Sequence, residues 1–304
     1  MNKPVIFLNG VEKMFPGLKL GPVSMEVEPG VIVAVVGPNG SGKTTFLHML
    51  MNIVRPEQGE ARLFGLDCDQ AETEIKRQIG YVGELGYVED ANWRVGELVQ
   101  YYSRWYPTWD ENRWRQLAER FELDLKQKLK RLSKGTKSRL MFSLALAHNP
   151  KLLILDEPSS GLDPSAWRIM VEEIKSFMDQ GNRNVIMATH NMEEVRRLAD
   201  YVAVFSKGKL IEYRVKDEIQ EQWKSLWIEQ KYGQLAASAP GIVLQEDGPM
   251  TRIVTRDAAR TEQALREAGI AVARRMALEW DEILELMIAQ QNDQRSMQRK
   301  EGLE

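Results

Sequence analysis

Apolar runs separated by helical patterns set the predicted architecture of the first two thirds of the chain. An almost continuous apolar run is typical of a strand that is buried on both faces, as in a parallel sheet. Four such runs occur, at Val31–Val36, Lys151–Leu155, Val185–Ala188 and Tyr201–Phe205. Helical patterns lie between them, at Thr44–Ile53, Lys137–Ala147, Ala166–Gln180 and Met192–Leu198. This alternation predicts an α/β domain with a mostly parallel core sheet.

Other parts of the chain have different patterns. The first thirty residues predict short strands with turns at Asn9-Gly10 and Pro29-Gly30. Residues 93–147 predict a helical insertion, because Trp, Tyr, Arg and Glu are frequent there and apolar residues have helical spacing. We therefore expect a first domain at 1–214 that carries this insertion.

The remainder of the chain predicts a small α+β appendage at 215–290. Its expected helices and strands lie at 216–224, 242–244, 252–255, 260–268 and 280–289. Residues 291–304 contain almost nothing to bury, so we expect a flexible tail there.

Composition excludes several classes of protein. The 304 residues include 41 Lys and Arg against 44 Asp and Glu, so the net charge of -3 excludes a strongly basic nucleic-acid binder. The single cysteine, Cys68, cannot form an internal disulfide. The longest unbroken apolar run, Val31–Val36, is far shorter than the roughly 18 to 20 residues that span a membrane. The start carries no export signal, so we expect a reduced, intracellular protein.

A glycine-rich loop provides the first chemical motif. It directly follows the run at Val31–Val36, precedes a helical pattern, and reads Gly37-Pro38-Asn39-Gly40-Ser41-Gly42-Lys43-Thr44. This spacing is that of a phosphate-binding loop, whose glycines let successive N–H groups point inward at the start of a helix. We expect Lys43 to reach the β- and γ-phosphates of a nucleotide and Thr44 to bind Mg²⁺.

Two carboxylates follow the second apolar run. Asp156 and Glu157 come at its end, which a parallel sheet places beside the phosphate loop. Asp156 is predicted to hold Mg²⁺, and Glu157 to orient and polarise an attacking water. Alternatively, the two acids cap the helix that follows them.

A third motif and its position carry a resemblance to a known family. Leu132-Ser133-Lys134-Gly135-Thr136 lies some ninety residues after the phosphate loop and just before Asp156. This order resembles the ATP-binding subunits of ABC transporters, over about Val5 to Glu212. The resemblance implies a P-loop ATPase fold of ABC type, ATP hydrolysis, and the cofactors ATP and Mg²⁺.

The resemblance also implies roles for further residues. Ser133 and Gly135 would contact the γ-phosphate held by a second subunit, although a serine before a helix is more often only its cap. Asp163, in Ser160-Gly161-Leu162-Asp163, would lie in the loop that meets that subunit. His190 would contact the γ-phosphate in its own subunit. Phe15 would stack on adenine or belong to the core, and Thr45 would extend the phosphate loop.

Departures from the family pattern affect the chemistry that we expect. Glu84 stands where the family usually has glutamine, and we expect it to be near the metal. Leu132–Thr136 resembles the signature motif of the family, but Lys134 and Thr136 replace its usual glycine and glutamine. These changes and the aromatic run at Tyr101–Asp110 are similar to the YtrB-like branch of type-two ABC export systems. The same departures allow another possibility, in which this chain hydrolyses ATP weakly and pairs with a more active subunit. In that case, Glu84→Gln should raise the ATP turnover of this chain.

The resemblance implies two protein partners. One is a second ATP-binding subunit, identical or different, and the other is a separate integral membrane permease, which would place the chain in the cytoplasm at the inner face of the membrane. Five aromatic residues are candidates for the groove that receives the permease, or for the helical insertion's own core: Trp93, Tyr101, Trp105, Trp109 and Trp114. No nucleic acid is expected. The alternative is a soluble ABC protein that acts on ribosomes or DNA, which the mild charge and the single ATPase half disfavour.

Overall fold

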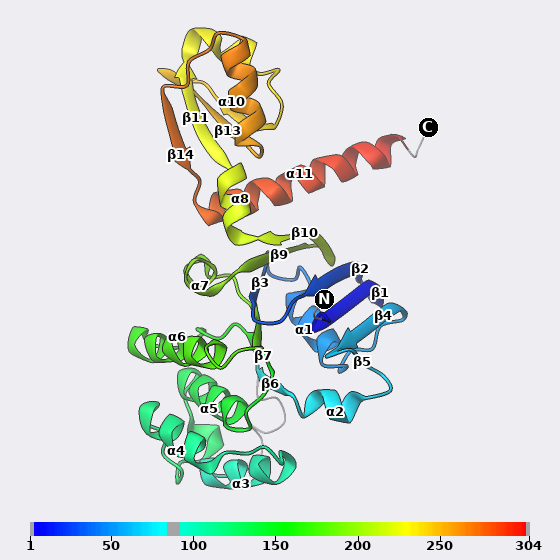
Figure 1. Ribbon diagram of the computed structural model, residues 1–304, viewed down its shortest axis with the longest axis vertical. Coiled ribbons are helices and arrows are strands. Elements are labelled where there is room, and N and C mark those ends of the chain that lie inside the picture. Colours follow the sequence, from blue (N-terminus) through cyan, green and yellow to red (C-terminus); the bar gives the residue numbers. More distant parts are fainter. Residues whose placement is uncertain (1–2, 84–91, 302–304) are drawn as a thin grey trace. The chain divides into compact units, whose positions relative to one another are not determined.

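The computed structural model describes residues 3–83 and 92–301, with side chains described as far as residue 292. The chain divides into two compact units, Met1–Tyr213 and Arg214–Glu304 (Figure 1). Within the described ranges, no helix is both long enough and apolar enough to cross a membrane.

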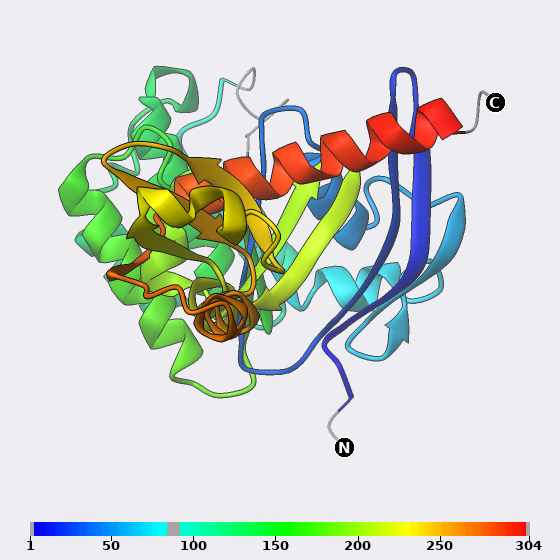
Figure 2. The same cartoon turned by 90° about the horizontal axis from the view of Figure 1, so that it is seen from above.

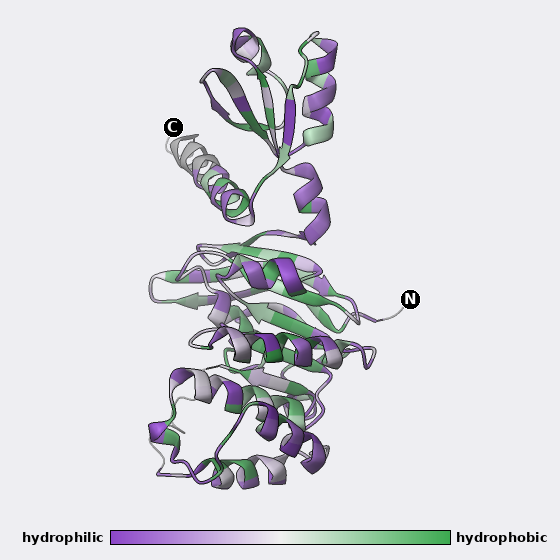
Figure 3. Ribbon diagram, turned by 90° about the vertical axis from the view of Figure 1, so that its left-hand side faces the viewer, coloured by the Kyte–Doolittle hydropathy of each residue, from purple (hydrophilic) through white to green (hydrophobic). Residues whose placement is uncertain are grey.

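The first unit is built on a mostly parallel sheet, as the apolar runs predict. In the described part of the chain the sheet has the order β10-β9-β3-β8-β7-β6. The pairs β3/β8, β3/β9, β7/β8 and β6/β7 are all parallel. The strands are β3 (Ile32–Val36), β6 (Ile79–Val82), β7 (Leu152–Asp156), β8 (Asn184–Ala188), β9 (Tyr201–Ser206) and β10 (Lys209–Val215). Every residue of β3 and β8 is buried, which explains why these strands are apolar at successive positions (Figure 3).

A second, antiparallel sheet is formed by two strands before β3 and two strands between β3 and β6, and has the order β2-β1-β4-β5. Its strands are β1 (Ile6–Phe15), β2 (Leu18–Val27), β4 (Gln58–Leu63) and β5 (Leu66–Asp67). The predicted turn at Asn9-Gly10 is wrong: these residues lie inside β1, at a break in register between Leu8 and Val11, and the turn comes after Phe15 (Figure 2). A glycine with positive φ suits a β-bulge as well as a turn, and Gly10 has φ +61°.

The described helices of the first unit are α1 (Lys43–Leu50), α2 (Glu72–Lys76), α3 (Val95–Trp105), α4 (Glu111–Arg120), α5 (Lys134–Ala147), α6 (Pro164–Met178) and α7 (Met192–Leu198). Four of them, α1, α5, α6 and α7, agree with the helical patterns, α3 and α4 lie in the predicted helical insertion, and α2 was not predicted. Helix α1 lies against the sheet, where Phe46 contacts Phe205 of β9 with 4.9 Å between ring centroids. The helices α3, α4 and α5 gather at one end of the unit (Figure 1).

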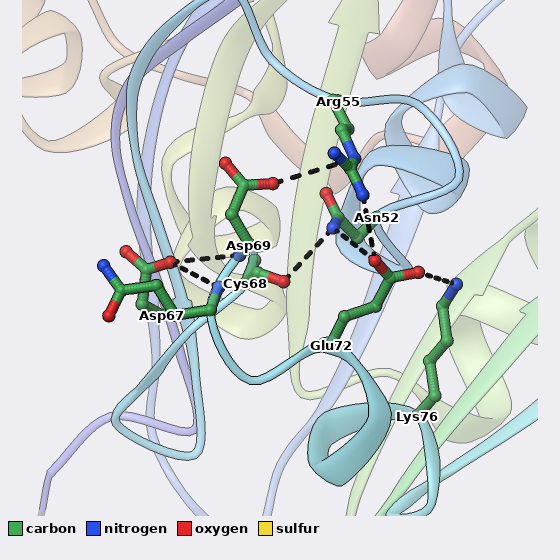
Figure 4. A network of polar contacts seen from close by, with 8 residues as sticks. Asn52, Arg55, Asp67, Cys68, Asp69, Glu72 and Lys76 are labelled. Atoms are coloured by element: carbon green, nitrogen blue, oxygen red, sulfur yellow. Dashed lines mark hydrogen bonds and ion pairs between the residues drawn. The ribbon is translucent and has the colours of Figure 1, made fainter.

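A polar network fixes the far end of α1 relative to α2 (Figure 4). Asn52, in the left-handed conformation just after α1, donates from Nδ2 to the carbonyl oxygen of Cys68 at 3.2 Å and to Glu72 at 3.3 Å. Arg55 also bonds the Glu72 carboxylate, at 3.1 Å, and Lys76 pairs with it one turn later on α2. The helix that starts at the phosphate loop is therefore held at both ends.

A buried carboxylate joins α4 to α6. The Glu173 side chain on α6 is 1% exposed and pairs with Arg113 and Arg120, both on α4. Its neighbour Glu172 is 53% exposed and pairs with Arg120 at 2.7 Å. The helical end of the unit is therefore attached to α6 through the buried acid.

The second unit is a four-stranded antiparallel sheet with two short connecting helices. The sheet order is β12-β13-β11-β14, and the element order β11, α9, β12, β13, α10, β14 is the ferredoxin-like arrangement. Its elements are α8 (Lys216–Gln222), β11 (Lys224–Glu229), α9 (Gly233–Ala236), β12 (Ile242–Glu246), β13 (Met250–Thr255), α10 (Ala258–Glu267), β14 (Arg274–Ala277) and α11 (Trp280–Glu301).

Two features of this unit differ from the sequence prediction. Strands β11 and β14 were not expected, and β14 is exposed at all four residues, so it carries no apolar alternation. Helix α11 continues to Glu301, through the segment predicted to be a flexible tail. The stretch from Gln290 to Glu301 lacks glycine and proline and is rich in good helix formers, so local propensity favours continuing the helix.

Glu173→Ala should destabilise the first unit, because it leaves two arginines without their buried partner. We expect a loss of about 2 kcal/mol in the free energy of unfolding, below the cost of a fully buried pair because both arginines are partly exposed. Urea unfolding followed by tryptophan fluorescence measures it. The matched control, Glu172→Ala, removes an exposed carboxylate and should cost at most about 0.5 kcal/mol. Equal losses for the two variants would contradict this role of Glu173.

Candidate active site

The loop between β3 and α1 has a backbone that only glycine can adopt at its first position. Gly37 has φ +147°, and a Cβ there would lie 2.1 Å from the carbonyl oxygen of Phe205. Gly40 and Gly42 also have positive φ, of +73° and +104°. Gly42 is the N-cap of α1 and, among the described residues, no side chain caps this helix start. The first N–H groups of α1 are thus left to bind an anion.

Lys43 lies inside this loop. Its side chain is 7% exposed, and Nζ donates to the carbonyl oxygens of Gly37 at 2.8 Å and Pro38 at 3.2 Å. Burial lowers the pKa of the Lys43 ammonium, and the nearby carboxylates of Glu157 and Asp156 oppose that effect. The loop therefore holds a cation next to its exposed residues Pro38, Asn39 and Gly40.

Asp156 ends β7 and contacts the loop through Thr44. A hydrogen bond from Thr44 favours its ionised form, but burial is the larger effect and raises the pKa of the carboxyl group. Among the described residues, its Oδ1 atom is buried without a hydrogen-bond partner. An orphaned carboxylate oxygen beside a hydroxyl is the kind of donor set that Mg²⁺ uses, completed by water and substrate phosphates.

Glu157 and His190 meet at the same edge of the sheet. Strands β7 and β8 are parallel neighbours with Asp156 opposite Ala188, so the residues that follow them lie side by side. Glu157 has φ +50°, and its N–H donates to the carbonyl oxygen of Ala188 at 2.9 Å. Its Oε2 atom lies 2.6 Å from Nδ1 of His190. The histidine side chain is 68% exposed, so its other nitrogen can meet a ligand.

The signature residues lie against the loop that follows Glu157. Ser133 is exposed and caps α5 by accepting a hydrogen bond from the Thr136 N–H at 3.1 Å. Gly135 is buried so closely that a Cβ there would lie 2.3 Å from the carbonyl oxygen of Gly161. Ser138 donates to the carbonyl oxygen of Pro158 at 3.1 Å. The start of α5 and residues 158–161 therefore form one surface.

Three further predicted site residues lie at the start of α6, at the end of β1 and on α1. Asp163 caps α6, and the N–H groups of Ala166 and Ser165 lower the pKa of its carboxyl group. Phe15 ends β1 and packs, partly buried, against the core of the unit. Thr45 is half-buried on α1. Glu84, predicted near the metal, lies outside the described residues.

The aromatic candidates separate into two groups. Trp114 is 2% exposed and belongs to the core of the helical end, and the partly buried Trp109 lies beside it with 6.1 Å between ring centroids. Trp93, Tyr101 and Trp105 are 38%, 46% and 63% exposed, and their rings contact one another with centroids 5.5 and 6.0 Å apart. We call these three residues the exposed aromatic cluster.

Sequence reasoning missed two residues that support the site. Gly208 donates its N–H to the carbonyl oxygen of Ser41 at 2.9 Å, and a Cβ there would lie 2.0 Å from the carbonyl oxygen of Lys19. The turn Lys207-Gly208 was its signal. Glu194 on α7 is completely buried. It has no sequence signal, because Glu193-Glu194 looks like an exposed helix face.

Comparisons with known proteins agree with this geometry. Residues 20–160 match the family described as ABC transporter. The chain is 31% identical over 218 residues to an uncharacterised ABC transporter ATP-binding protein, YdbJ of Bacillus subtilis, covering 69% of each chain. It is 34% identical over 208 residues to a Nod factor export ATP-binding protein I of Burkholderia thailandensis, covering 66% of this chain and 67% of the relative.

Solved structures show the same fold. An ATP-binding subunit of an ABC transporter has a TM-score of 0.65 at 24% identity, and covers 72% of this chain and 92% of its own. A dimeric ATP-binding cassette in a post-hydrolysis state with ADP and Pi has a TM-score of 0.61 at 22% identity, with 69% and 98% covered. Together, the family match and the relatives show that the chain belongs to the ABC transporter family, as one of its ATP-binding, ATP-hydrolysing proteins.

Proposed function

We propose that the chain is the ATP-hydrolysing subunit of an ABC transporter and that Glu157 is its catalytic base. The observation that carries the proposal is the 2.6 Å contact between Glu157 and His190, next to Lys43 and Asp156. Phosphoryl transfer requires a base that is held in position next to groups that bind phosphate. Glu157 and His190 would be this base and the group that orients it, beside the free amides of the phosphate loop and the buried Lys43.

The phosphate loop would bind the triphosphate. The uncapped start of α1 and the Lys43 ammonium supply positive charge where the β- and γ-phosphates would lie. Thr44 and Asp156 would hold Mg²⁺, which supplies charge neutralisation on the phosphate oxygens when bound. Among the described residues no three His, Cys, Asp or Glu side chains form a metal site, so the substrate itself would complete this one. Glu84 is proposed as a further group near the metal.

Hydrolysis would begin at a water next to Glu157. Its carboxylate takes a proton from the water, the water oxygen forms a bond to the γ-phosphorus, and the bond to the oxygen of ADP breaks. Nδ1 of His190 donates to the ionised Glu157, so a neutral imidazole leaves Nε2 only as an acceptor. Nε2 would donate to a γ-phosphate oxygen when both ring nitrogens carry a proton. Pairing with Glu157 thereby orients the histidine ring as well as the base.

A second ATP-binding subunit would complete each site. Ser133 and the N–H groups at the start of α5 are presented on the surface, and Gly135 contacts Gly161 in the loop that follows the base. Anion binding at this helix start would place them on a γ-phosphate held by the other subunit. Asp163 would lie at the same contact, and Phe15 and Thr45 would lie at the nucleotide of their own subunit.

A membrane permease is the proposed recipient of the energy. The exposed aromatic cluster supports this, because aromatic side chains are preferred anchors in protein interfaces. Export is the proposed direction, supported by the relative whose name includes Nod factor export. The chain would then work in the cytoplasm at the inner face of the membrane.

Glu157→Gln should stop turnover without preventing ATP binding. Removing a general base should lower the ATP hydrolysis rate by about 100-fold or more. With ATP and Mg²⁺ the variant should shift in solution mass from monomer to dimer, because the closed state can no longer hydrolyse its ligand. Light scattering coupled to size exclusion measures the mass, and phosphate release measures the rate.

Wild type without nucleotide and Glu193→Gln, which removes an exposed carboxylate from α7, are the controls. A Glu157→Gln variant that still hydrolyses ATP at a rate within threefold of wild type would rule out Glu157 as the base. A mass that stays monomeric with ATP bound would argue against a homodimer.

Trp105→Ala should separate ATP hydrolysis from membrane attachment. Hydrolysis by the isolated chain should stay within twofold of wild type, because the cluster is not part of the proposed catalytic machinery. The fraction of the chain that sediments with membranes of producing cells should fall at least threefold. Leu235→Ala removes a comparably exposed side chain, 56% exposed, from the second unit and is the control. Unchanged sedimentation of Trp105→Ala would place the permease contact elsewhere.

A further inference from the structure

Glu194 is a buried acid that the proposed chemistry does not use. It lies on α7, its side chain is 0% exposed, and both carboxyl oxygens lack solvent contact and a well-aligned hydrogen bond to the described residues. Its neighbour Glu193 is 49% exposed and pairs with Arg197 at 3.0 Å. Adjacent glutamates on one helix thus have opposite surroundings, and the buried one has no cation to pair with in the described part of the chain.

Two hydroxyl groups lie close enough to the Glu194 carboxyl group to lower its pKa, those of Ser159 and Thr189. Thr189 is completely buried, donates its N–H to the carbonyl oxygen of Val35 at 3.1 Å, and immediately precedes His190. Its hydroxyl oxygen already accepts the N–H of Asn191 at 2.9 Å, so its proton is available to Glu194. Ser159 lies two residues after Glu157. Glu194 therefore lies between the two loops that carry the base and the histidine.

The burial of Glu194 favours its neutral form. An ionised carboxylate without a cation is far more costly to bury than a carboxylic acid with two polar neighbours. The two hydroxyls favour ionisation, but burial is the larger effect and raises the pKa of the carboxyl group. Of the charged groups near it, Glu157 raises this pKa further and His190 lowers it. A protonated carboxyl group can accept a hydrogen bond from one hydroxyl and donate one to the other, whereas an ionised carboxylate can only accept.

We propose that Glu194, as a neutral carboxylic acid, is a positioning residue that links Ser159 to Thr189 and thereby sets the contact between Glu157 and His190. The acid itself touches no substrate. It acts by holding together the two loops that follow the neighbouring strands β7 and β8, which end at Asp156 and Ala188. The inference rests on the proposed roles of Glu157 and His190.

The test compares Glu194→Gln with Glu194→Ala in the full chain. Glutamine offers the same acceptor and donor as the protonated acid, so its kcat should stay within about twofold of wild type. Alanine removes the link, so kcat should fall at least tenfold, while the KM for ATP changes less than threefold because the phosphate loop is untouched. Glu193→Gln is the matched control and should behave like wild type.

A second measurement remains informative if Glu194→Ala does not fold. In the unfolded chain Glu194 ionises at the ordinary glutamate pKa, and in the folded chain its pKa is higher. Wild type should therefore lose stability as the pH rises from the unfolded pKa to the folded pKa. The glutamine in Glu194→Gln cannot ionise. The melting temperature of this variant minus that of wild type should therefore be larger at pH 8 than at pH 5. Glu193→Gln, measured in parallel, corrects for the loss of a carboxylate from α7.

The outcomes separate the inference from the proposed function. A tenfold loss of kcat in Glu194→Gln, or a melting difference from wild type that does not change with pH, would overturn the neutral link. Wild-type kcat in a folded Glu194→Ala would overturn its positioning role. Retained hydrolysis in Glu157→Gln would instead refute the proposed base, and the pH-dependent melting difference would be unaffected by that result.

Discussion

The hydrogen-bonded alignment of β3, β8 and β7 is the constraint on which the site depends. These three parallel neighbours end together, with Val35 opposite Ala188 and Ala188 opposite Asp156. The ladder continues for one bond beyond the strands, because Thr189 donates its N–H to Val35 and Glu157 donates its N–H to Ala188. The phosphate loop, Glu157 and His190 therefore start from one edge, and none of them needs a long connection to reach the others.

Burial at this edge makes each charge depend on its neighbours. Lys43 is removed from water, which weakens its hold on a proton, and Asp156 and Glu157 restore part of it. Asp156 is in the opposite position, because burial opposes its negative charge. In the described part of the chain, Lys43 donates to two backbone carbonyl oxygens, whereas Oδ1 of Asp156 has no hydrogen-bond partner and no side chain caps the start of α1. A metal-bound triphosphate, as proposed above, would supply ligands for this carboxylate oxygen and for the free N–H groups of α1.

The helical end of the first unit is attached to this edge through α6. That helix begins after Asp163, in the loop that carries Glu157, and its buried Glu173 pairs with Arg113 and Arg120 on α4. The start of α5 touches the same loop where Gly135 meets Gly161. A change in the loop would therefore be felt by α4 and α5 together. The exposed aromatic cluster on and beside α3 lies in the same helical segment, at the surface where the membrane partner is proposed to dock.

The sequence alone determined the four buried strands β3, β7, β8 and β9, the helices α1, α5, α6 and α7, and the phosphate loop, because these depend on local regularities: apolar runs, helical spacing and glycines at fixed intervals. It also indicated Asp156 and Glu157, since both follow an apolar strand and a parallel sheet brings such positions to one edge, whereas His190 was indicated by the family resemblance. Only the tertiary structure showed that Asn9-Gly10 is a bulge, that β14 pairs without any apolar residue pattern, and that Glu193 and Glu194 differ completely in burial. Strand partners and burial depend on residues far away in the chain. The sequence of a polar pair such as Glu193-Glu194 therefore does not indicate which of its residues is exposed to water and which is buried in the core.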